Sequence, residues 1–213
     1  MRFLVLIVLL TITVVIIQIE IFTLVLSRLG LSPHSATLLL ITTFVGSAIN
    51  LPLARVSSSF HYDPQNPLQQ IFVPFRFKEG TTIISINVGG GLIPIVFSVY
   101  LMQNINISMT IIMLAVGVVS AVSYYFSRPI TNIGIGMPLL IAPLCAALTA
   151  IVLSHEQAPA LAYICGSLGV VIGADLLRIK DIRQLNIANA SIGGAGTFDG
   201  IFMTGIIAVL LTY

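Results

Sequence analysis

The stretch Phe3–Leu26, FLVLIVLLTITVVIIQIEIFTLVL, contains one acidic residue and no basic one. About 20 consecutive apolar residues are enough to cross the hydrocarbon core of a bilayer as an α-helix. Lipid offers the backbone no hydrogen-bond partners, so a membrane segment of this kind must satisfy its own amides and carbonyls. The run therefore predicts a membrane helix, and it sets the class of fold for the remainder of the chain.

The composition extends this prediction to the whole chain. Of its 213 residues, 57% are hydrophobic and only 8% are charged, with a mean hydropathy of +1.09. A soluble domain carries about 25% charged residues. We therefore predict an all-α fold, a polytopic helix bundle forming a single transmembrane domain over residues 1–213. Its seven expected spans are 3–26, 35–54, 84–102, 106–126, 133–153, 158–177 and 193–213.

The basic residues predict the orientation. Lysine and arginine accumulate in the cytoplasmic loops of membrane proteins. With seven spans, only Arg28 falls on the side opposite the N-terminus. We thus expect an integral protein of a prokaryotic cytoplasmic membrane, with its N-terminus in the cytoplasm and its C-terminus outside. Basic residues this few, placed at span ends, argue against nucleic acid as a partner. Those on the N-terminal side are Arg2, Arg55, Arg76, Lys78, Arg128, Arg178, Lys180 and Arg183.

Residues 55–83 form the one sizeable polar excursion, on the cytoplasmic side. The pattern QQIFVPFRF-KEG-TTIISINV, beginning at Gln69, alternates around a glycine-containing turn and suggests a short β-hairpin. Pro74 would confine its strand to a sheet edge. The alternative is an amphipathic loop lying on the cytoplasmic leaflet.

Two similar motifs begin expected spans on the cytoplasmic side. They are NVGGGLIPI, starting at Asn87, and NIGIGMPLL, starting at Asn132. Spans interrupted by glycine and proline at matching positions are typical of broken helices that line a transport site. Chance similarity between glycine-rich segments is the alternative. The candidate substrate-binding residues here are Asn87, Gly89, Gly90, Gly91, Pro94, Asn132, Gly134, Gly136 and Pro138.

Three carboxylates are expected at membrane depth: Glu20, Asp175 and Asp199. Each costs at least about 2.5–3.5 kcal/mol on insertion scales, so each is a functional candidate. Glu20 is interpreted as a residue that reaches the outer surface or bonds a neighbouring helix. Asp175 and Asp199 are expected at similar depth, near the cytoplasmic ends of the sixth and seventh spans.

Glycines four residues apart could bring those two spans together. Gly169 and Gly173 form one such pair, and Gly196 and Gly200 form the other. Two carboxylates in a poorly hydrated site share a proton, as in aspartic proteases. The segment GGAGTFDG, with Gly194, Gly196, Thr197, Phe198 and Gly200, would admit water and a substrate backbone beside Asp199. The alternatives are an Asp175–Arg178 ion pair and an Asp199 that caps its helix or bonds Thr197.

The motifs INVGGGLIP, GIGMPLLIAP and GGAGTFDGIF together resemble an uncharacterised prokaryotic family of multi-pass membrane proteins, from Phe75 onward. That resemblance implies no activity. The placement of the two aspartates is also similar to intramembrane aspartyl proteases of the presenilin and signal-peptide-peptidase type. It implies Asp175 and Asp199 as the catalytic pair. Ala174 precedes Asp175 where those proteins have Tyr, and two extra residues follow the Gly-x-Gly before Asp199.

The sequence therefore leaves three functions open. The first is an intramembrane aspartyl protease, a hydrolase that cleaves membrane-embedded peptide segments and needs no metal or cofactor. The alternative is a small proton- or ion-coupled transporter or flippase, with a site at the broken helices near Asn87 and Asn132. A non-catalytic membrane scaffold is the third possibility. Membrane lipids, a transmembrane peptide substrate and a second copy of the chain are the expected partners.

Overall fold

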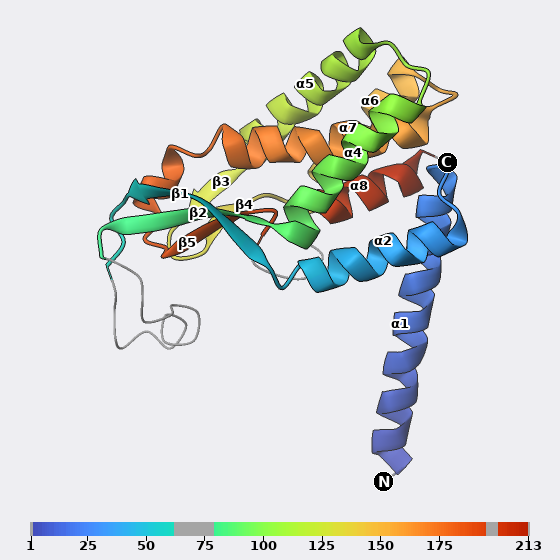
Figure 1. Cartoon of the computed structure of the whole chain (residues 1–213), viewed down its shortest axis with the longest axis horizontal. Coiled ribbons are helices and arrows are strands. Elements are labelled where there is room, and N and C mark those ends of the chain that lie inside the picture. Colours follow the sequence, from blue (N-terminus) through green and yellow to red (C-terminus); the bar gives the residue numbers. More distant parts are fainter. Residues whose placement is uncertain (1, 62–78, 195–199, 213) are drawn as a thin grey trace.

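The computed structural model describes residues 2–61, 79–194 and 200–212. Over these ranges the chain is mostly helical, with seven α-helices and two small sheets. Helix α1 (Arg2–Arg28) projects away from the other elements, and α2 (Pro33–Gly46) runs back along the bundle (Figure 1). The chain bends by 119° between these two helices. Ser32 caps α2 by accepting a hydrogen bond from the Ser35 amide at 3.2 Å.

Five helices form the bundle: α4 (Ile93–Asn104), α5 (Met109–Phe126), α6 (Ile141–Leu153), α7 (Ala158–Val170) and α8 (Gly200–Leu211). Helix α7 is the most enclosed, since its side chains from Leu161 to Cys165 are almost fully buried. The rings of Phe97 and Tyr163 meet edge to face, with centroids 5.0 Å apart. Phe202 of α8 meets Phe22 in the same way at 6.0 Å, which attaches the end of α1 to the bundle.

Helices α7 and α8 pack closely through small residues. An added Cβ at Gly166 would lie 3.3 Å from Cγ2 of Thr204, and one at Gly205 would lie 2.7 Å from Oγ of Ser167. Adjacency of the two aspartate-bearing segments was expected, and these contacts confirm it for the helices themselves.

The glycines expected to make that contact have another neighbour. An added Cβ at Gly169 would lie 2.6 Å from Cγ1 of Val119, and Gly173 abuts Ser120, so both glycines face α5. Gly200 has open space around it, and Gly196 lies outside the described residues. The prediction that Gly169 and Gly173 pack against the last helix is therefore wrong. Spacing identifies a face that packs closely, but it does not identify the helix packed there.

The larger sheet has the order β1-β2-β5. Strand β1 (Asn50–Ser57) is antiparallel to β2 (Thr81–Asn87), which is parallel to β5 (Asn189–Ile192). A second, two-stranded sheet pairs β3 (Arg128–Ile130) with β4 (Gly134–Gly136). All five strands gather at one end of the molecule, away from α1 (Figure 1).

Several expected spans are shorter than predicted, because their ends belong to these strands. Residues 50–54, 84–87 and 134–136 are strands, and α6 begins only at Ile141. A short apolar run such as TTIISI satisfies a hydropathy count, while its β-branched residues favour a strand. The strand expected after Gly80 is confirmed as β2, and its partners are β1 and β5. The other expected hairpin strand, including Pro74, lies outside the described residues.

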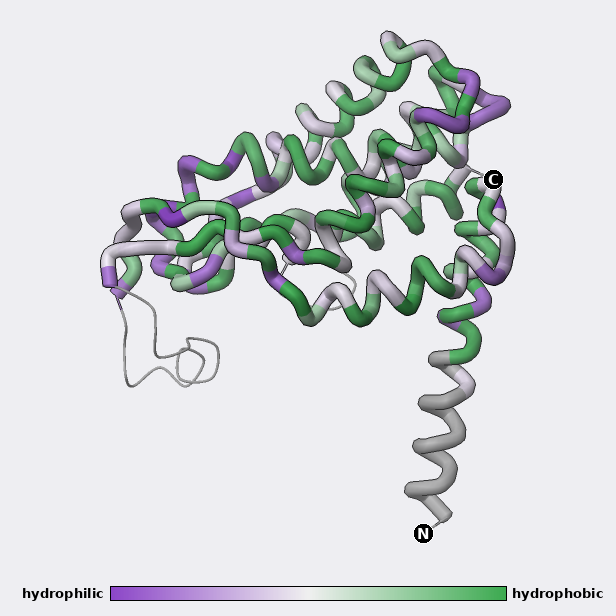
Figure 2. Tube along the Cα trace, viewed as in Figure 1, coloured by the Kyte–Doolittle hydropathy of each residue, from purple (hydrophilic) through white to green (hydrophobic). Residues whose placement is uncertain are grey.

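Among the described helices, two are long and apolar enough to cross a membrane: Met109–Phe126 and Ala158–Leu176. The bent pair Ile16–Arg28 and Pro33–Gly46 makes a third if it is counted as one span. Hydrophobic residues predominate along the helices, whereas hydrophilic ones concentrate at the sheet end and at the opposite loops (Figure 2). These features fit a membrane protein of mostly helical fold. The full set of seven spans stays a prediction.

Candidate active site

A cavity of about 120 Å³ lies at the sheet end of the bundle, between the two sheets. Asp175 supplies the only carboxylate among its described lining residues, and Asn189 and Ser191 add polar groups. Three residues predicted from the sequence as site residues meet here: Asp175, Gly134 and Gly194. The remaining lining residues are Ile133, Ile135, Ile182, Leu185, Ile187, Ala190 and Ile192.

Asp175 lies on a π-helical turn, η2 (Val171–Leu176), which continues α7. The Leu177 amide bonds the Ile172 carbonyl at 2.9 Å, the five-residue spacing of such a turn. Gly173 presses against α5, where an added Cβ would lie 2.9 Å from Cβ of Ser123. The turn that carries the half-buried Asp175 is thereby held against a neighbouring helix. Single π-helical turns inside helices are frequent at functional sites.

The wall opposite β4 is strand β5 and the turn that follows it. The Gly194 amide donates to the Ser191 carbonyl at 3.2 Å. Gly193 sits between them with φ +81°, as the third position of a type II turn requires. Gly193 also touches the backbone of Gly91, and a Cβ at Gly91 would lie 2.9 Å from the Ile192 carbonyl oxygen. The turn therefore joins the cavity wall to the start of α4.

Asn87 occupies a fully buried position where β2 ends. Its Nδ2 donates to the Ser47 carbonyl at 2.7 Å and to Oδ1 of Asn50 at 3.1 Å. Its Oδ1 accepts from the Gly90 amide at 2.7 Å, which caps the π-helical turn η1 (Val88–Leu92). Each polar atom of this side chain thus has a partner within the protein.

The glycines that follow Asn87 let backbones meet. Gly89 abuts the last turn of α2, where a Cβ would lie 2.5 Å from the Ser47 nitrogen. Gly90 and Gly91 are buried, as is Pro94 in the first turn of α4. The interruption predicted at this motif is present, because a strand and a π-helical turn precede α4. A role of these residues in binding substrate stays a prediction.

Asn132 lies in the exposed turn between β3 and β4, with φ +64°. Its amide donates to the Leu185 carbonyl at 2.7 Å, and its Oδ1 accepts from Nδ2 of Asn186 at 2.8 Å. Gly136 belongs to β4, and Pro138 follows it at an exposed position. Neither Asn132 nor Asn87 lines the 120 Å³ cavity, and the two side chains have different hydrogen-bond partners. The two similar motifs therefore occupy different structural environments.

Arg178 secures the segment after Asp175 to the end of α5. Its guanidinium pairs with Asp181 at 3.1 Å and donates to the carbonyls of Tyr124 and Ser127 at 2.8 and 2.9 Å. It also lies 4.3 Å from the centre of the Tyr124 ring. Cationic groups at a helix carboxyl end are stabilising. Arg178 thus pairs with Asp181, whereas the sequence offered Asp175 as an alternative partner.

Four predicted site residues, Gly196, Thr197, Phe198 and Asp199, lie outside the described residues. Glu20 is exposed on α1. Among the residues placed by the structure, no group of three His, Cys, Asp or Glu side chains is suited to hold a metal ion.

Sequence reasoning missed a polar network beside the cavity. Asn50 Oδ1 accepts from both Asn87 Nδ2 and Ser191 Oγ, the latter at 2.7 Å, and Ser85 Oγ donates to Oδ1 of Asn189 at 2.8 Å. The segment NIANAS, starting at Asn186, carried a signal, because asparagine is uncommon in apolar strands. Its meaning depends on the pairing of β5 with β2, which joins residues about 105 positions apart.

The fold and the site together fit a mostly helical membrane protein. Its helices lead into small sheets, and these sheets border a cavity that contains the Asp175 carboxylate. The sequence identifies the family. A profile of DUF1614, a family of proteins of unknown function, matches residues 44–211, so the chain belongs to this family. The match includes β1 to α8 and thus the whole described cavity. No curated protein and no solved structure matches the chain.

Proposed function

We propose that this protein is an intramembrane aspartyl peptidase that hydrolyses peptide bonds of membrane-embedded segments, with Asp175 and Asp199 as its two carboxylates. One observation supports this most. Asp175 lines a small cavity together with the edge of β5 and with Gly194, and Asp199 follows Gly194 by five positions in the chain. Acidic and strand-edge groups in one cavity are what hydrolysis of an extended peptide needs.

In the proposed reaction, the ionised carboxylate takes a proton from water as the oxygen attacks the peptide carbonyl carbon. The protonated partner donates its proton to the carbonyl oxygen. In the collapse of the tetrahedral gem-diol, the first carboxyl group gives its proton to the nitrogen and the C–N bond breaks. The second carboxylate takes a proton back from one of the two hydroxyl groups as the C=O bond re-forms. Both carboxyl groups then return to their starting state, with one proton between them.

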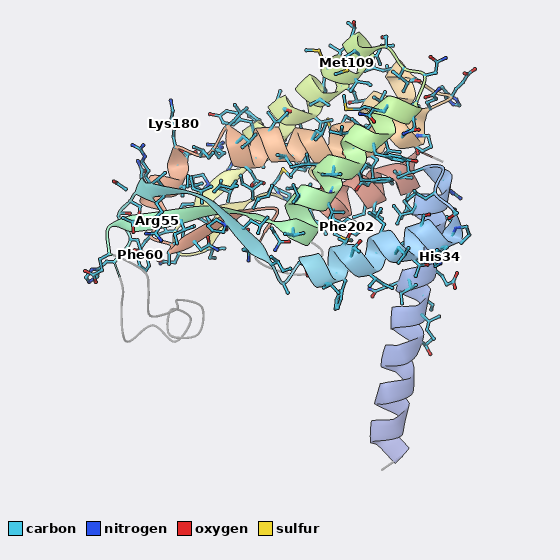
Figure 3. The ribbon with its side chains drawn as sticks, in the orientation of Figure 1. His34, Arg55, Phe60, Met109, Lys180 and Phe202 are labelled. Atoms are coloured by element: carbon cyan, nitrogen blue, oxygen red, sulfur yellow. The ribbon has the colours of Figure 1, made fainter. Side chains whose placement is uncertain are left out.

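The finer topology belongs to the same proposal. Seven spans with a cytoplasmic N-terminus place the carboxyl end of α7 and the start of α8 near the cytoplasmic surface. A substrate would therefore be cut near the cytoplasmic end of its own span. The exposed Arg55 and Lys180 at the sheet end of the molecule support this orientation (Figure 3).

Cleavage of a reporter tests the proposal. The full chain, reconstituted in vesicles, is incubated with a fluorescently labelled transmembrane helix, and products are separated by size and identified by mass. Asp175→Asn and Asp199→Asn should each lower the rate at least about a hundredfold. Asp181→Asn is the matched control, because Asp181 pairs with Arg178 and does not line the cavity. Wild-type activity in either test variant would end this proposal.

A second function, transport, has an observation of its own. A larger cavity of about 540 Å³ lies between α2 and α4, lined mainly by apolar side chains, and reaches Leu92 and Ile93 beside the break that follows Asn87. A broken helix next to an apolar cavity is compatible with a flippase or an ion-coupled carrier. Proton-dependent uptake into vesicles, lost in a variant of Thr42 in this cavity and retained in Asp175→Asn, would favour transport over hydrolysis.

A further inference from the structure

The cavity of about 540 Å³ between α2 and α4 forms a second site, here named the α2–α4 groove. We propose that this groove holds one acyl chain of an anionic phospholipid, with the headgroup beside the turn that joins α1 to α2. Among the described residues, none lines both this groove and the cavity beside Asp175. The inference is therefore independent of the proposed peptidase and goes beyond it.

The groove is closed at one end by a contact between two glycines. An added Cβ at Gly46, the last residue of α2, would lie 3.1 Å from the amide nitrogen of Gly89 in η1. Helices α2 and α4 approach each other at this end and diverge from it toward the α1–α2 turn (Figure 1). A chain that enters the groove from the α1–α2 turn would therefore end near Gly46.

The walls of the groove are apolar, and their hydroxyl groups already have partners. Neither α2 nor α4 contains Asp, Glu, Lys or Arg. The Thr42 hydroxyl donates to the carbonyls of Leu38 and Leu39 at 2.8 and 3.0 Å. Oγ of Ser35 lies 3.0 Å from Oγ of Ser32. These walls therefore favour a hydrocarbon ligand, because they present no unmatched polar group from α2.

The dimensions fit one chain and exclude a helix. Between Ile93 and Tyr100 the α4 wall is about 10 Å long, at about 1.5 Å per residue. Dividing the volume by this length gives a mean cross-section of at most about 50 Å². A helix is about 10–12 Å across with its side chains, a cross-section of about 80–110 Å². An extended chain advances about 1.2 Å per bond, so roughly nine carbon atoms would lie along this wall.

The end of the groove at the α1–α2 turn is suited to a negative headgroup. Leu31 and Ser35 line the groove at this end. Arg28, the last residue of α1, is exposed, and so is His34 in the first turn of α2 (Figure 3). The first turn of α2 is also the positive end of its helix dipole. A phosphate group would be attracted to this end, while its acyl chain lies between the helices.

Fluorescence quenching tests this inference, because the chain contains no tryptophan. Tyr100→Trp places a probe in the groove, and Met113→Trp places a matched probe on the exposed surface of α5. Each full-length protein is reconstituted in vesicles of phosphatidylcholine and phosphatidylglycerol, and one of the two lipids carries bromine on its acyl chains as the quencher. The Tyr100→Trp probe should show an affinity for phosphatidylglycerol at least about threefold that for phosphatidylcholine, whereas the Met113→Trp probe should show a ratio of about one.

Two valines of α4 separate the groove from the remaining surface of that helix. Val96 and Val99 are both exposed, but only Val96 belongs to the described lining of the groove. In the Tyr100→Trp protein, Val96→Phe should lower the ratio to about one, because the ring takes the space of the chain. Val99→Phe should leave the ratio unchanged. Arg28→Gln should lower it by at least half, because the headgroup loses its charged neighbour.

Three results would overturn the lipid site. Equal affinity ratios at the two probes would mean that the groove contacts ordinary bilayer lipid. A preference that survives Val96→Phe would place the anionic lipid outside the groove. Weak quenching of the Tyr100→Trp probe by both brominated lipids would mean that protein, such as a second copy of the chain, covers the groove. Cleavage of the labelled transmembrane helix is measured separately, so the peptidase proposal can fail while the lipid site holds, and the reverse.

Discussion

Replacing Asn87 with alanine removes a fully buried side chain that makes three hydrogen bonds. The Ser47 carbonyl and the Gly90 amide lose these bonds in positions closed to water. Each lost bond costs about 1 kcal/mol, and an orphaned buried group costs about 1–3 kcal/mol. We therefore expect Asn87→Ala to lower the free energy of unfolding by about 3–4 kcal/mol, a value that includes the loss of the helix cap.

The assay is equilibrium unfolding in mixed micelles, followed by circular dichroism as the denaturing detergent is increased. Asn104→Ala is the control, since this exposed asparagine makes one bond, to the Tyr100 carbonyl at 2.7 Å. Its loss should change stability by less than about 0.5 kcal/mol. Asn87→Asp keeps an acceptor for Gly90 but has no donor for Ser47, so it should be at least as unstable as the alanine variant.

The result that would refute this reasoning is an Asn87→Ala protein as stable as the Asn104→Ala protein. If that protein also lost uptake activity, Asn87 would be a transport residue and not a cap. If Asn87→Ala lowers stability and leaves uptake unchanged, the role of Asn87 is to stabilise the fold.

The glycines give two further tests by the same unfolding assay. Gly193→Ala should cost about 3 kcal/mol, because φ is +81° and the new Cβ meets the backbone of Gly91. Gly30→Ala, with φ +87° in open space, should cost only about 1 kcal/mol, and equal losses would contradict the contact. Gly173→Ala should cost about 2 kcal/mol through contact with α5, whereas Gly117→Ala, exposed on α5, should stabilise by about 0.5–1 kcal/mol. A Gly173→Ala protein with an unchanged free energy of unfolding would show that η2 is not held against α5.

Sequence alone predicted the apolar helices typical of a membrane protein, the interruption at the motif that follows Asn87 and a strand after Gly80. These features depend on composition and on local backbone preferences, which neighbouring residues express directly. It also predicted that Asp175, Gly134 and Gly194 belong to a site, and the three line one cavity.

The pairing of the strands in the larger sheet could not be predicted from the sequence. Strand β2 pairs with β1 and β5, and β5 lies about 105 positions away, so no local pattern encodes the contact. The same limit applied to Gly169 and Gly173, whose spacing gives a face but not the neighbour on it. Helical spacing offered Asp175 as an alternative partner of Arg178, whereas the π-helical turn and the chain after it bring Arg178 to Asp181.

The most direct test of the central claim is the cleavage rate of the reporter helix by Asp175→Asn, Asp199→Asn and the double variant. Two carboxylates that act as one unit lose function together, so each single variant should fall at least about a hundredfold and the double variant no further. A single variant that cleaves at the wild-type rate, or losses that multiply in the double variant, would contradict a shared catalytic pair.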